Sequence, residues 1–277
     1  MSVCSITNLG SCLPESFFSY IQSLLNGPVQ PLLDLVKKLL TEPINIEVFR
    51  GFWQLIIYVL SFFYVFLFIY CGYQFMVSGY DSAKRTQAKS WLQRIVIMIL
   101  LVNASFFLYN LALDLAASAS LSMYNLIDPD FFKIIADDLP SLGLQLIFVG
   151  AYALMLVLAV FLLGIRFLIV ALGVVLFPIG LFLYFFPPTE AYGKFILYIL
   201  AGLLLLPFFQ SIILVGSAQL MTDQTFTNMN IIVATIAFAL VNILTIVVFY
   251  LALNQTSKTV ANVDIGKTVV GVGKWFI

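Results

Sequence analysis

The stretch that decides the fold class is Leu142–Phe186, which reads LGLQLIFVGAYALMLVLAVFLLGIRFLIVALGVVLFPIGLFLYFF. It contains a single charged residue, Arg166. A helix needs about 20 apolar residues to cross a hydrocarbon core about 30 Å thick. This run is roughly twice that length, so it predicts a protein embedded in a membrane.

The composition of the whole chain agrees with this prediction. Of its 277 residues, 62 % are hydrophobic and only 9 % are charged, whereas soluble domains average about 45–50 % apolar and about 25 % charged residues. The 13 basic residues balance the 13 acidic ones, and there is no histidine. A chain without imidazole has no His-ligated metal, no Ser-His-Asp triad and no histidine acid–base chemistry.

Further apolar stretches are long enough to span a bilayer, and none alternates with the period of two that a barrel strand requires. Helices satisfy their own backbone groups in lipid, so they are the expected spanning form. The fold class is therefore predicted as all-α, a polytopic transmembrane helical bundle. The additional spans are Phe52–Val77, Ile95–Ala117, Phe195–Met221 and Ile231–Leu253.

The number of crossings depends on how the long stretch is divided. A turn at Gly164–Arg166 would give six crossings, whereas one full span with a re-entrant or broken segment would give five. The helix-weakening residues Gly173, Pro178 and Gly180 favour the second alternative, and Pro207 is expected to kink a later span. The distribution of Lys and Arg also favours five crossings.

Basic residues near the span ends predict the orientation. The predicted loop Ser78–Arg94 carries Lys84, Arg85, Lys89 and Arg94, whereas the loop after the second span carries mainly aspartates. We therefore expect a multi-pass protein of the cell membrane (inner or plasma) with its N-terminus outside and its C-terminus in the cytoplasm. The expected parts are an extracytoplasmic amphipathic N-terminal segment (1–50), a transmembrane helical domain (51–254) and a C-terminal tail (255–277).

The N-terminal segment combines an amphipathic helix with two cysteines. Leu32, Leu35, Val36 and Leu39 repeat at helical spacing, which is typical of an interfacial helix; a surface helix docked on the membrane domain and a partner contact are the alternatives. Cys4 and Cys12 would form a disulfide in an oxidising compartment and would otherwise be free thiols.

Polar residues inside the spans are the candidate functional residues. An arginine at the bilayer midplane costs about 2.5–3.5 kcal/mol, so Arg166 should line a pore, form a buried ion pair or sit in a turn near the headgroups. Asn103, Asn110 and Asp114 project within about 20° of a common line on a helix. This polar stripe indicates either helix–helix hydrogen bonds or a hydrated path, with Asp114 as a partner for Arg166. The isolated amides of Gln145, Gln210, Gln219 and Asn242 are expected to hold the bundle together.

Motifs for catalysis and cofactor binding are missing from the sequence. It has no Walker loop, no dinucleotide fingerprint, no HExxH and no metal-type cysteine spacing,. We therefore expect a protein that is not an enzyme and that uses neither a cofactor nor a metal.

Three features carry a resemblance to a known family. They are the amphipathic N-terminal segment, the basic segment GYQFMVSGYDSAKRTQAKSWLQR (residues 72–94) and the later segment from Arg166 through Phe177-Pro178 to the turn Pro187–Glu190. Together they resemble the TrbL-type polytopic channel components of type IV secretion and conjugation systems, and the plan is especially similar to that of the archaeal CedA DNA importers. The PPTEAYGK loop is poorer in Arg and Trp than its bacterial counterparts.

The resemblance implies a non-enzymatic membrane scaffold or channel subunit. Such a subunit would form a homo-oligomeric ring and work with pilin-like subunits and a cytoplasmic ATPase, with single-stranded DNA in transit and membrane lipid around it. Because DNA needs neutralising walls, a ring would repeat Arg166 around an axis. The basic residues of 84–94 would contact the ATPase or, alternatively, set the topology and attract anionic lipid. A small-solute permease and a structural assembly factor without a conduit are the alternative functions.

Overall fold

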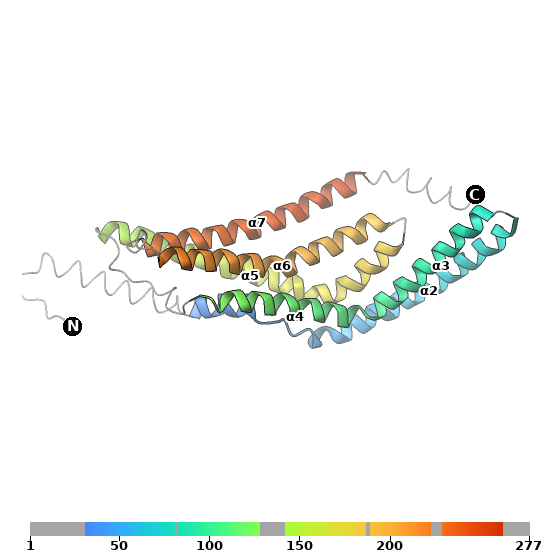
Figure 1. The fold of residues 1–277 in the computed structure, drawn as a ribbon, viewed down its shortest axis with the longest axis horizontal. Helices are drawn as coiled ribbons and strands as arrows, with labels where there is room; N and C mark the ends of the chain where they lie inside the picture. The colour runs from blue at the N-terminus through green and yellow to red at the C-terminus, as the bar shows by residue number, and fades with distance from the viewer. Residues whose placement is uncertain (1–30, 81, 128–141, 187–188, 223–228, 263–277) are drawn as a thin grey trace, which may run out of the picture. The chain divides into compact units, whose positions relative to one another are not determined.

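The computed structural model of the chain describes all residues except 1–30, 81, 128–141, 187–188, 223–228 and 263–277. The described part is helical and contains no strand. A helix over residues 31–41 precedes the six helices labelled in Figure 1. Those six are α2 (Arg50–Val77), α3 (Ser82–Asn103), α4 (Ser105–Tyr124), α5 (Leu142–Phe185), α6 (Glu190–Met221) and α7 (Asn230–Asn262).

Five helical segments of the described chain are long and apolar enough to cross a membrane, as expected for a multi-pass membrane protein,. The second of them lies later in the chain than the predicted Ile95–Ala117. The backbone hydrogen bonds from Ala104 N to Leu100 O and from Leu108 N to Ala104 O continue from α3 into α4, so the predicted span straddles this junction. The five segments are Glu47–Val77, Ser105–Tyr124, Ile147–Phe185, Glu190–Met221 and Asn230–Ala252.

Helix α5 is continuous, although the sequence suggested an interruption. It runs unbroken from Leu142 to Phe185, through both Arg166 and Pro178. The turn at Gly164–Arg166 that six crossings required is therefore not found, and neither is the break expected at Pro178. Forty-four helical residues rise about 66 Å. A proline removes only one backbone hydrogen bond, and the surrounding apolar helix-forming residues carry the helix past it.

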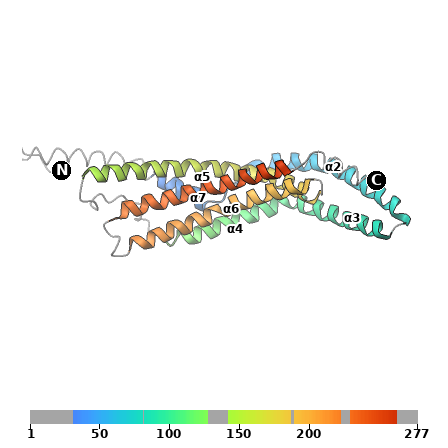
Figure 2. The ribbon, with the colours of Figure 1, turned by 90° about the horizontal axis from the view of Figure 1, so that it is seen from above.

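Most of the predicted loop Ser78–Arg94 is also helical, because α3 begins at Ser82. Alanine, lysine, arginine and glutamine are strong helix formers, and they dominate the first turns of α3. The connection between α2 and α3 is only a short 3-10 turn, Ser78–Tyr80, followed by residue 81. The two helices consequently run side by side as a hairpin (Figures 1 and 2).

The described residues form two compact units, and each unit is assembled from several chain segments. Unit 1 contains the described residues of Met1–Glu42, Ala117–Ile165 and Leu206–Ile246. In its core, side chains of residues 31–41 pack against α5, α6 and α7. The buried members from the N-terminal helix are Leu33, Val36 and Leu40, whereas Leu35 is exposed. This helix is therefore docked on the apolar helices of unit 1, which was one of the alternatives. Its buried face is slightly rotated from the predicted one, which included Leu35.

Unit 2 contains the described residues of Pro43–Ala116, Arg166–Leu205 and Val247–Ile277, and it has two apolar clusters. The first joins α4, α5 and α6 around Tyr109, Val170 and Leu203. The second joins α2 and α3, with Leu181 of α5 also in it. The central residues of the second cluster are Leu60, Tyr64, Cys71, Ile95, Met98 and Val102.

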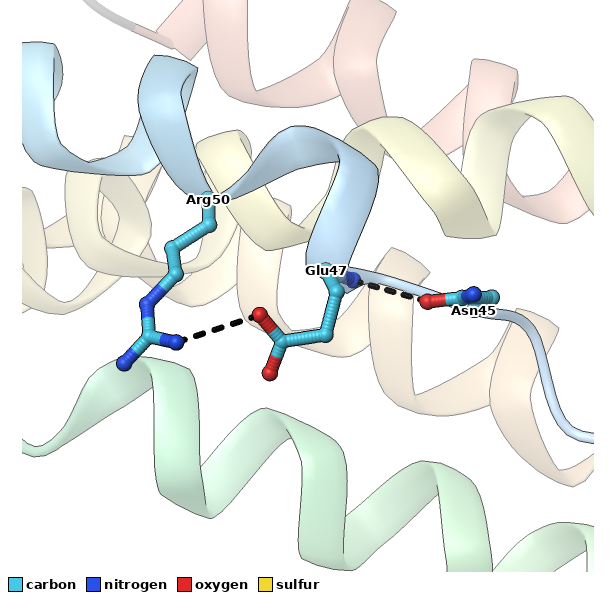
Figure 3. Close-up of polar contacts among 3 residues, drawn as sticks. All are labelled: Asn45, Glu47 and Arg50. Carbon is cyan, nitrogen blue, oxygen red and sulfur yellow. Dashed lines mark hydrogen bonds and ion pairs between the residues drawn. The ribbon is translucent and has the colours of Figure 1, made fainter.

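Polar contacts hold the start of α2 in unit 2. The backbone N–H of Glu47 donates to Asn45 Oδ1 over 3.1 Å, and the Glu47 carboxylate accepts from Arg50 Nη1 over 3.2 Å (Figure 3). The Arg50 guanidinium also lies 5.6 Å from the centre of the Phe106 ring, within the range of a cation–π contact. One turn later, Trp53 Nε1 donates to Ser105 Oγ over 2.9 Å. These contacts fix α2 against the beginning of α4.

Some predicted features lie outside the described residues. Cys4 and Cys12 fall in residues 1–30, and the aspartate-rich loop falls largely in residues 128–141. Of the predicted tail, the described part is the backbone of α7 up to Asn262. The side chain of Lys84 is likewise outside the description, although its backbone belongs to α3.

Candidate functional site

Arg166 is the centre of a buried polar site in unit 2. Its side chain lies within α5 and is 5 % exposed. Its Nε donates a hydrogen bond of 2.8 Å to the backbone carbonyl oxygen of Leu203 on α6. Arg166 is therefore neither a turn residue at the headgroups nor a side chain that faces an open conduit. It is held inside the helical packing of one chain.

The sequence of α6 explains why a backbone carbonyl is available there. In an α-helix the carbonyl of Leu203 would accept a hydrogen bond from the N–H of residue 207. Residue 207 is a proline, which has no N–H. An unpaired carbonyl in an apolar environment costs free energy comparable to a lost hydrogen bond. Arg166 supplies the donor that Pro207 removes, and this pairing offsets part of the cost of burying the arginine.

Tyr109 extends this site from α4 to α5. Its hydroxyl donates a hydrogen bond of 2.6 Å to the carbonyl of Val170, one turn after Arg166 on α5. The Tyr109 hydroxyl is also close enough to Arg166 for an electrostatic interaction. Side chains therefore bond α4 to α5 and α5 to α6, both times through a backbone carbonyl. We call Tyr109, Arg166, Val170 and Leu203 the carbonyl relay.

The glycines predicted to weaken α5 serve instead as points of close helix approach. A Cβ added to Gly173 would collide with the Tyr109 hydroxyl and would lie 2.8 Å from Leu200 Cδ2. A Cβ on Gly180 would lie 2.9 Å from Ile196 Cγ2 of α6. Small residues commonly allow membrane helices to approach one another in this way. The helix stays intact because each glycine keeps its backbone N–H.

A second buried polar group joins α5, α6 and α7 in unit 1. Gln210 Nε2 donates to Thr245 Oγ1 over 2.7 Å, and that hydroxyl donates to the carbonyl of Val241 over 2.8 Å. Asn242 Nδ2 donates to the carbonyl of Met155 over 2.9 Å. Gln210 and Asn242 thus cross-link helices, which confirms the role expected for these two amides. Their carbonyl oxygens, Gln210 Oε1 and Asn242 Oδ1, have no hydrogen-bond partner in the described structure. Gln219 is exposed, and the side chain of Gln145 lies outside the description.

The predicted polar stripe lies on an exposed face of unit 2. Asn103 and Asp114 are exposed, and Asn110 is half-buried. Asn103 Nδ2 donates to the Ile99 carbonyl of its own helix, and Asn110 Nδ2 donates to Asp114 Oδ2 over 3.3 Å. Asp114 was the expected partner of Arg166, but its carboxylate accepts from Asn110 instead. Because the candidate span is Ser105–Tyr124, Asp114 lies near its middle rather than near its outer end.

The four basic residues singled out in the sequence lie on α3, which contributes no residue to the carbonyl relay. The side chains of Arg85, Lys89 and Arg94 are exposed. Together with Lys84 they lie between Ser82 and Arg94 of α3, a helix that contains no acidic residue. The structure therefore presents these charges along a helix and not on a loop.

The relay residues Tyr109 and Leu203 were missed by sequence reasoning. A signal for Leu203 exists, since a proline inside a span exposes the carbonyl four residues before it and a buried arginine needs acceptors. The described residues contain no group of three or more metal-ligating His, Cys, Asp or Glu side chains. Comparisons with models of protein families, with curated proteins and with solved structures gave no match.

Proposed function

We propose that the protein is a membrane scaffold subunit of a conjugation-like, type IV secretion-related machine that supports DNA translocation or pilus assembly across the cell membrane. In this proposal it assembles with other copies, and with further membrane subunits, through the polar stripe formed by Asn103 at the end of α3 and by Asn110 and Asp114 on α4. The observation that carries the proposal is the hydrogen bond between half-buried Asn110 and exposed Asp114 on a helix long and apolar enough to span a membrane.

The pair supports assembly because lipid is a poor environment for it. A carboxylate at the centre of a span costs about 2.5–3.5 kcal/mol when it faces hydrocarbon. Its hydrogen bond to Asn110 satisfies only part of the four acceptor positions of a carboxylate. A neighbouring subunit or a water-filled space supplies the rest. Interhelical hydrogen bonds in membranes contribute about 0.6 kcal/mol each, so Asn110 and Asp114 within the candidate span favour a multi-subunit contact.

The burial of Arg166 favours a scaffold over a conduit lined by this chain alone. Phosphates along a nucleic acid strand attract basic residues, whereas the exposed charge on the polar stripe is the carboxylate of Asp114. Arg166 already has an acceptor in Leu203. We therefore place the cargo path at contacts with other subunits, and we assign the energy supply to a separate cytoplasmic ATPase.

A complementation experiment in the native host tests the proposal. Cells that lack the protein receive the wild type, the variant Asn110→Leu/Asp114→Leu or the matched control Phe107→Leu, which changes a neighbouring exposed residue without removing a polar group. Assembly size in blue-native gels, DNA transfer frequency, pilus number and solute uptake are measured at equal protein levels.

We expect the double variant to shift the assembly to smaller species and to reduce transfer or piliation at least tenfold, while Phe107→Leu behaves as the wild type. A deletion strain with normal DNA transfer and normal pili would refute the machine assignment. A deletion that changes only solute uptake would favour the small-solute permease. Loss of pili with DNA transfer intact would favour the assembly factor without a conduit.

A further inference from the structure

We propose that the distal half of the α2–α3 hairpin lies in the membrane–water interface and binds anionic phospholipid headgroups with its α3 side. This half, which we call the interfacial arm, consists of Val65–Val77 of α2 and Ser82–Arg94 of α3. The proposal does not depend on the function proposed above, because it concerns the lipid that surrounds unit 2.

Side-chain contacts show that the two helices of the arm are paired. The Cys71 thiol lies against the carbonyl of Ala88, with 4.0 Å between sulfur and oxygen. The rings of Tyr70 and Trp91 meet edge to face with their centroids 5.7 Å apart. Tyr64 and Ile95 belong to the same buried cluster. Residues 65–77 therefore run along residues 82–94, with the turn at the tip of the arm (Figure 2).

The α2 side of the arm is apolar and uncovered. Met76 at the tip is 81 % exposed, and several large side chains nearer to the bundle are exposed as well. This surface contains no charged residue. Its exposed members are Val65, Phe66, Phe68, Ile69, Tyr73, Phe75, Met76 and Val77.

The α3 side of the arm is basic. Arg85, Lys89 and Arg94 are exposed, and Ser82–Asn103 contains no acidic residue. A basic residue close to the positive N-terminal end of a helix is unfavourable, so the charge of Arg85 does not serve the stability of α3. The uncharged residues between the basic residues, Gln87, Ser90 and Gln93, are also exposed and polar.

An apolar α2 side and a basic α3 side argue against an arm that crosses the hydrocarbon core and against one that projects into water. If the arm crossed the hydrocarbon core, at least three cations would face acyl chains, and each would be costly. If it projected into water, a contiguous apolar surface would be exposed. In the interface, α2 contacts acyl chains while α3 faces the headgroups, as in amphipathic membrane-surface helices. Positive charge without acidic neighbours selects anionic over zwitterionic lipid.

The first experiment measures the depth of the arm in the full-length protein. The protein with Cys4→Ser and Cys12→Ser is placed in nanodiscs containing phosphatidylglycerol, and a spin label is attached at Met76→Cys or at Ser90→Cys. We expect the label at residue 76 to collide mainly with oxygen and the label at residue 90 mainly with a water-soluble nickel chelate. Chelate access at both positions would overturn the proposal in favour of a water-exposed arm, such as one that binds an acidic protein. Protection of residue 76 from both reagents would overturn it in favour of cover by a second copy.

The second experiment measures lipid selectivity by native mass spectrometry with phosphatidylglycerol and phosphatidylcholine. Each basic contact with an anionic surface is worth about a fivefold preference, so the wild type should prefer phosphatidylglycerol by at least about fivefold. The variant Arg85→Gln/Lys89→Gln/Arg94→Gln should lose that preference, and the matched control Gln87→Ala/Ser90→Ala/Gln93→Ala should keep it. Retention by the triple Gln variant would overturn the proposal. The variant Arg85→Lys/Arg94→Lys keeps the charge and should keep the preference for phosphatidylglycerol. If this variant lost the preference, a charge-based contact would also be overturned.

Discussion

Arg166 donates a hydrogen bond to the carbonyl that Pro207 leaves without its helical partner, the carbonyl of Leu203. A buried cation and a proline, each unfavourable in the interior of a membrane helix, thus offset one another. The arginine is a structural element of unit 2, and its contribution can be measured separately from any role in transport.

Replacing Arg166 by leucine should lower the free energy of unfolding by about 1–3 kcal/mol, because the Leu203 carbonyl is then buried without a donor. Adding Pro207→Ala should recover most of this loss, since an alanine at that position supplies the missing N–H. The measurement is a double-mutant cycle of unfolding in detergent micelles, which subtracts the separate effect of removing the proline. Pro178→Ala is the control, and its cycle with Arg166→Leu should show no coupling. Equal coupling for both prolines would contradict the relay.

Gly173→Ala should destabilise unit 2 by about 1–3 kcal/mol, because the new methyl group overlaps the Tyr109 hydroxyl and Leu200,. Tyr109→Phe in the same chain should relieve part of the overlap, so the two changes should be less than additive. Gly164→Ala is the control, since nothing lies within 4 Å of a Cβ at that position. Thermal unfolding of the four variants tests this, and a harmless Gly173→Ala would mean that α4 and α5 are farther apart.

Thr245→Val should cost about 1–3 kcal/mol, because it removes the acceptor of the Gln210 amide in the core of unit 1,. Gln210→Leu combined with Thr245→Val should be closer to the wild type than Thr245→Val alone, since both polar partners are then gone. Thr235→Val, whose hydroxyl donates to the Ile231 carbonyl of its own helix, should have a small effect. Chemical unfolding followed by circular dichroism is the measurement, and a larger loss in the double variant would argue against this pairing.

Val36→Lys should detach the helix over residues 31–41, because Val36 is buried in the core of unit 1. Leu35→Lys should be tolerated, since Leu35 is exposed. Limited proteolysis in nanodiscs distinguishes the two variants, with faster cleavage near this helix expected only for Val36→Lys. The reverse result would restore the predicted face that includes Leu35 and place this helix in the lipid interface.

The all-helical class and the apolar spans could be predicted because a membrane-spanning helix needs a run of about 20 apolar residues. Such a run is visible in the sequence itself. The path of α5 could not be predicted from its glycines and Pro178, since helix-weakening residues have the same appearance whether they break a helix or allow a neighbour to approach. The first turns of α3 were predicted as a loop because of their charged residues. Charged helix formers such as Lys89 suit both a polar connection and a helix outside the hydrocarbon core.

The site was only partly predictable. The sequence identifies Arg166 as a residue that needs shelter, and Gln210 and Asn242 as cross-linking amides. The acceptor of Arg166 is a backbone atom, however, and side-chain patterns do not identify backbone partners. The exposed position of Asp114 likewise depends on which face of α4 packs against the rest of unit 2, a choice that the small residues of α4 leave open.

The dependence of Arg166 on Pro207 also constrains how this chain can diverge. A lineage that first replaces the proline regains the amide of α6, and the arginine can then be replaced by an apolar residue at little cost. A lineage that first loses the arginine passes through a protein with a bare carbonyl in its interior. Substitutions at these two positions should therefore accumulate in a preferred order.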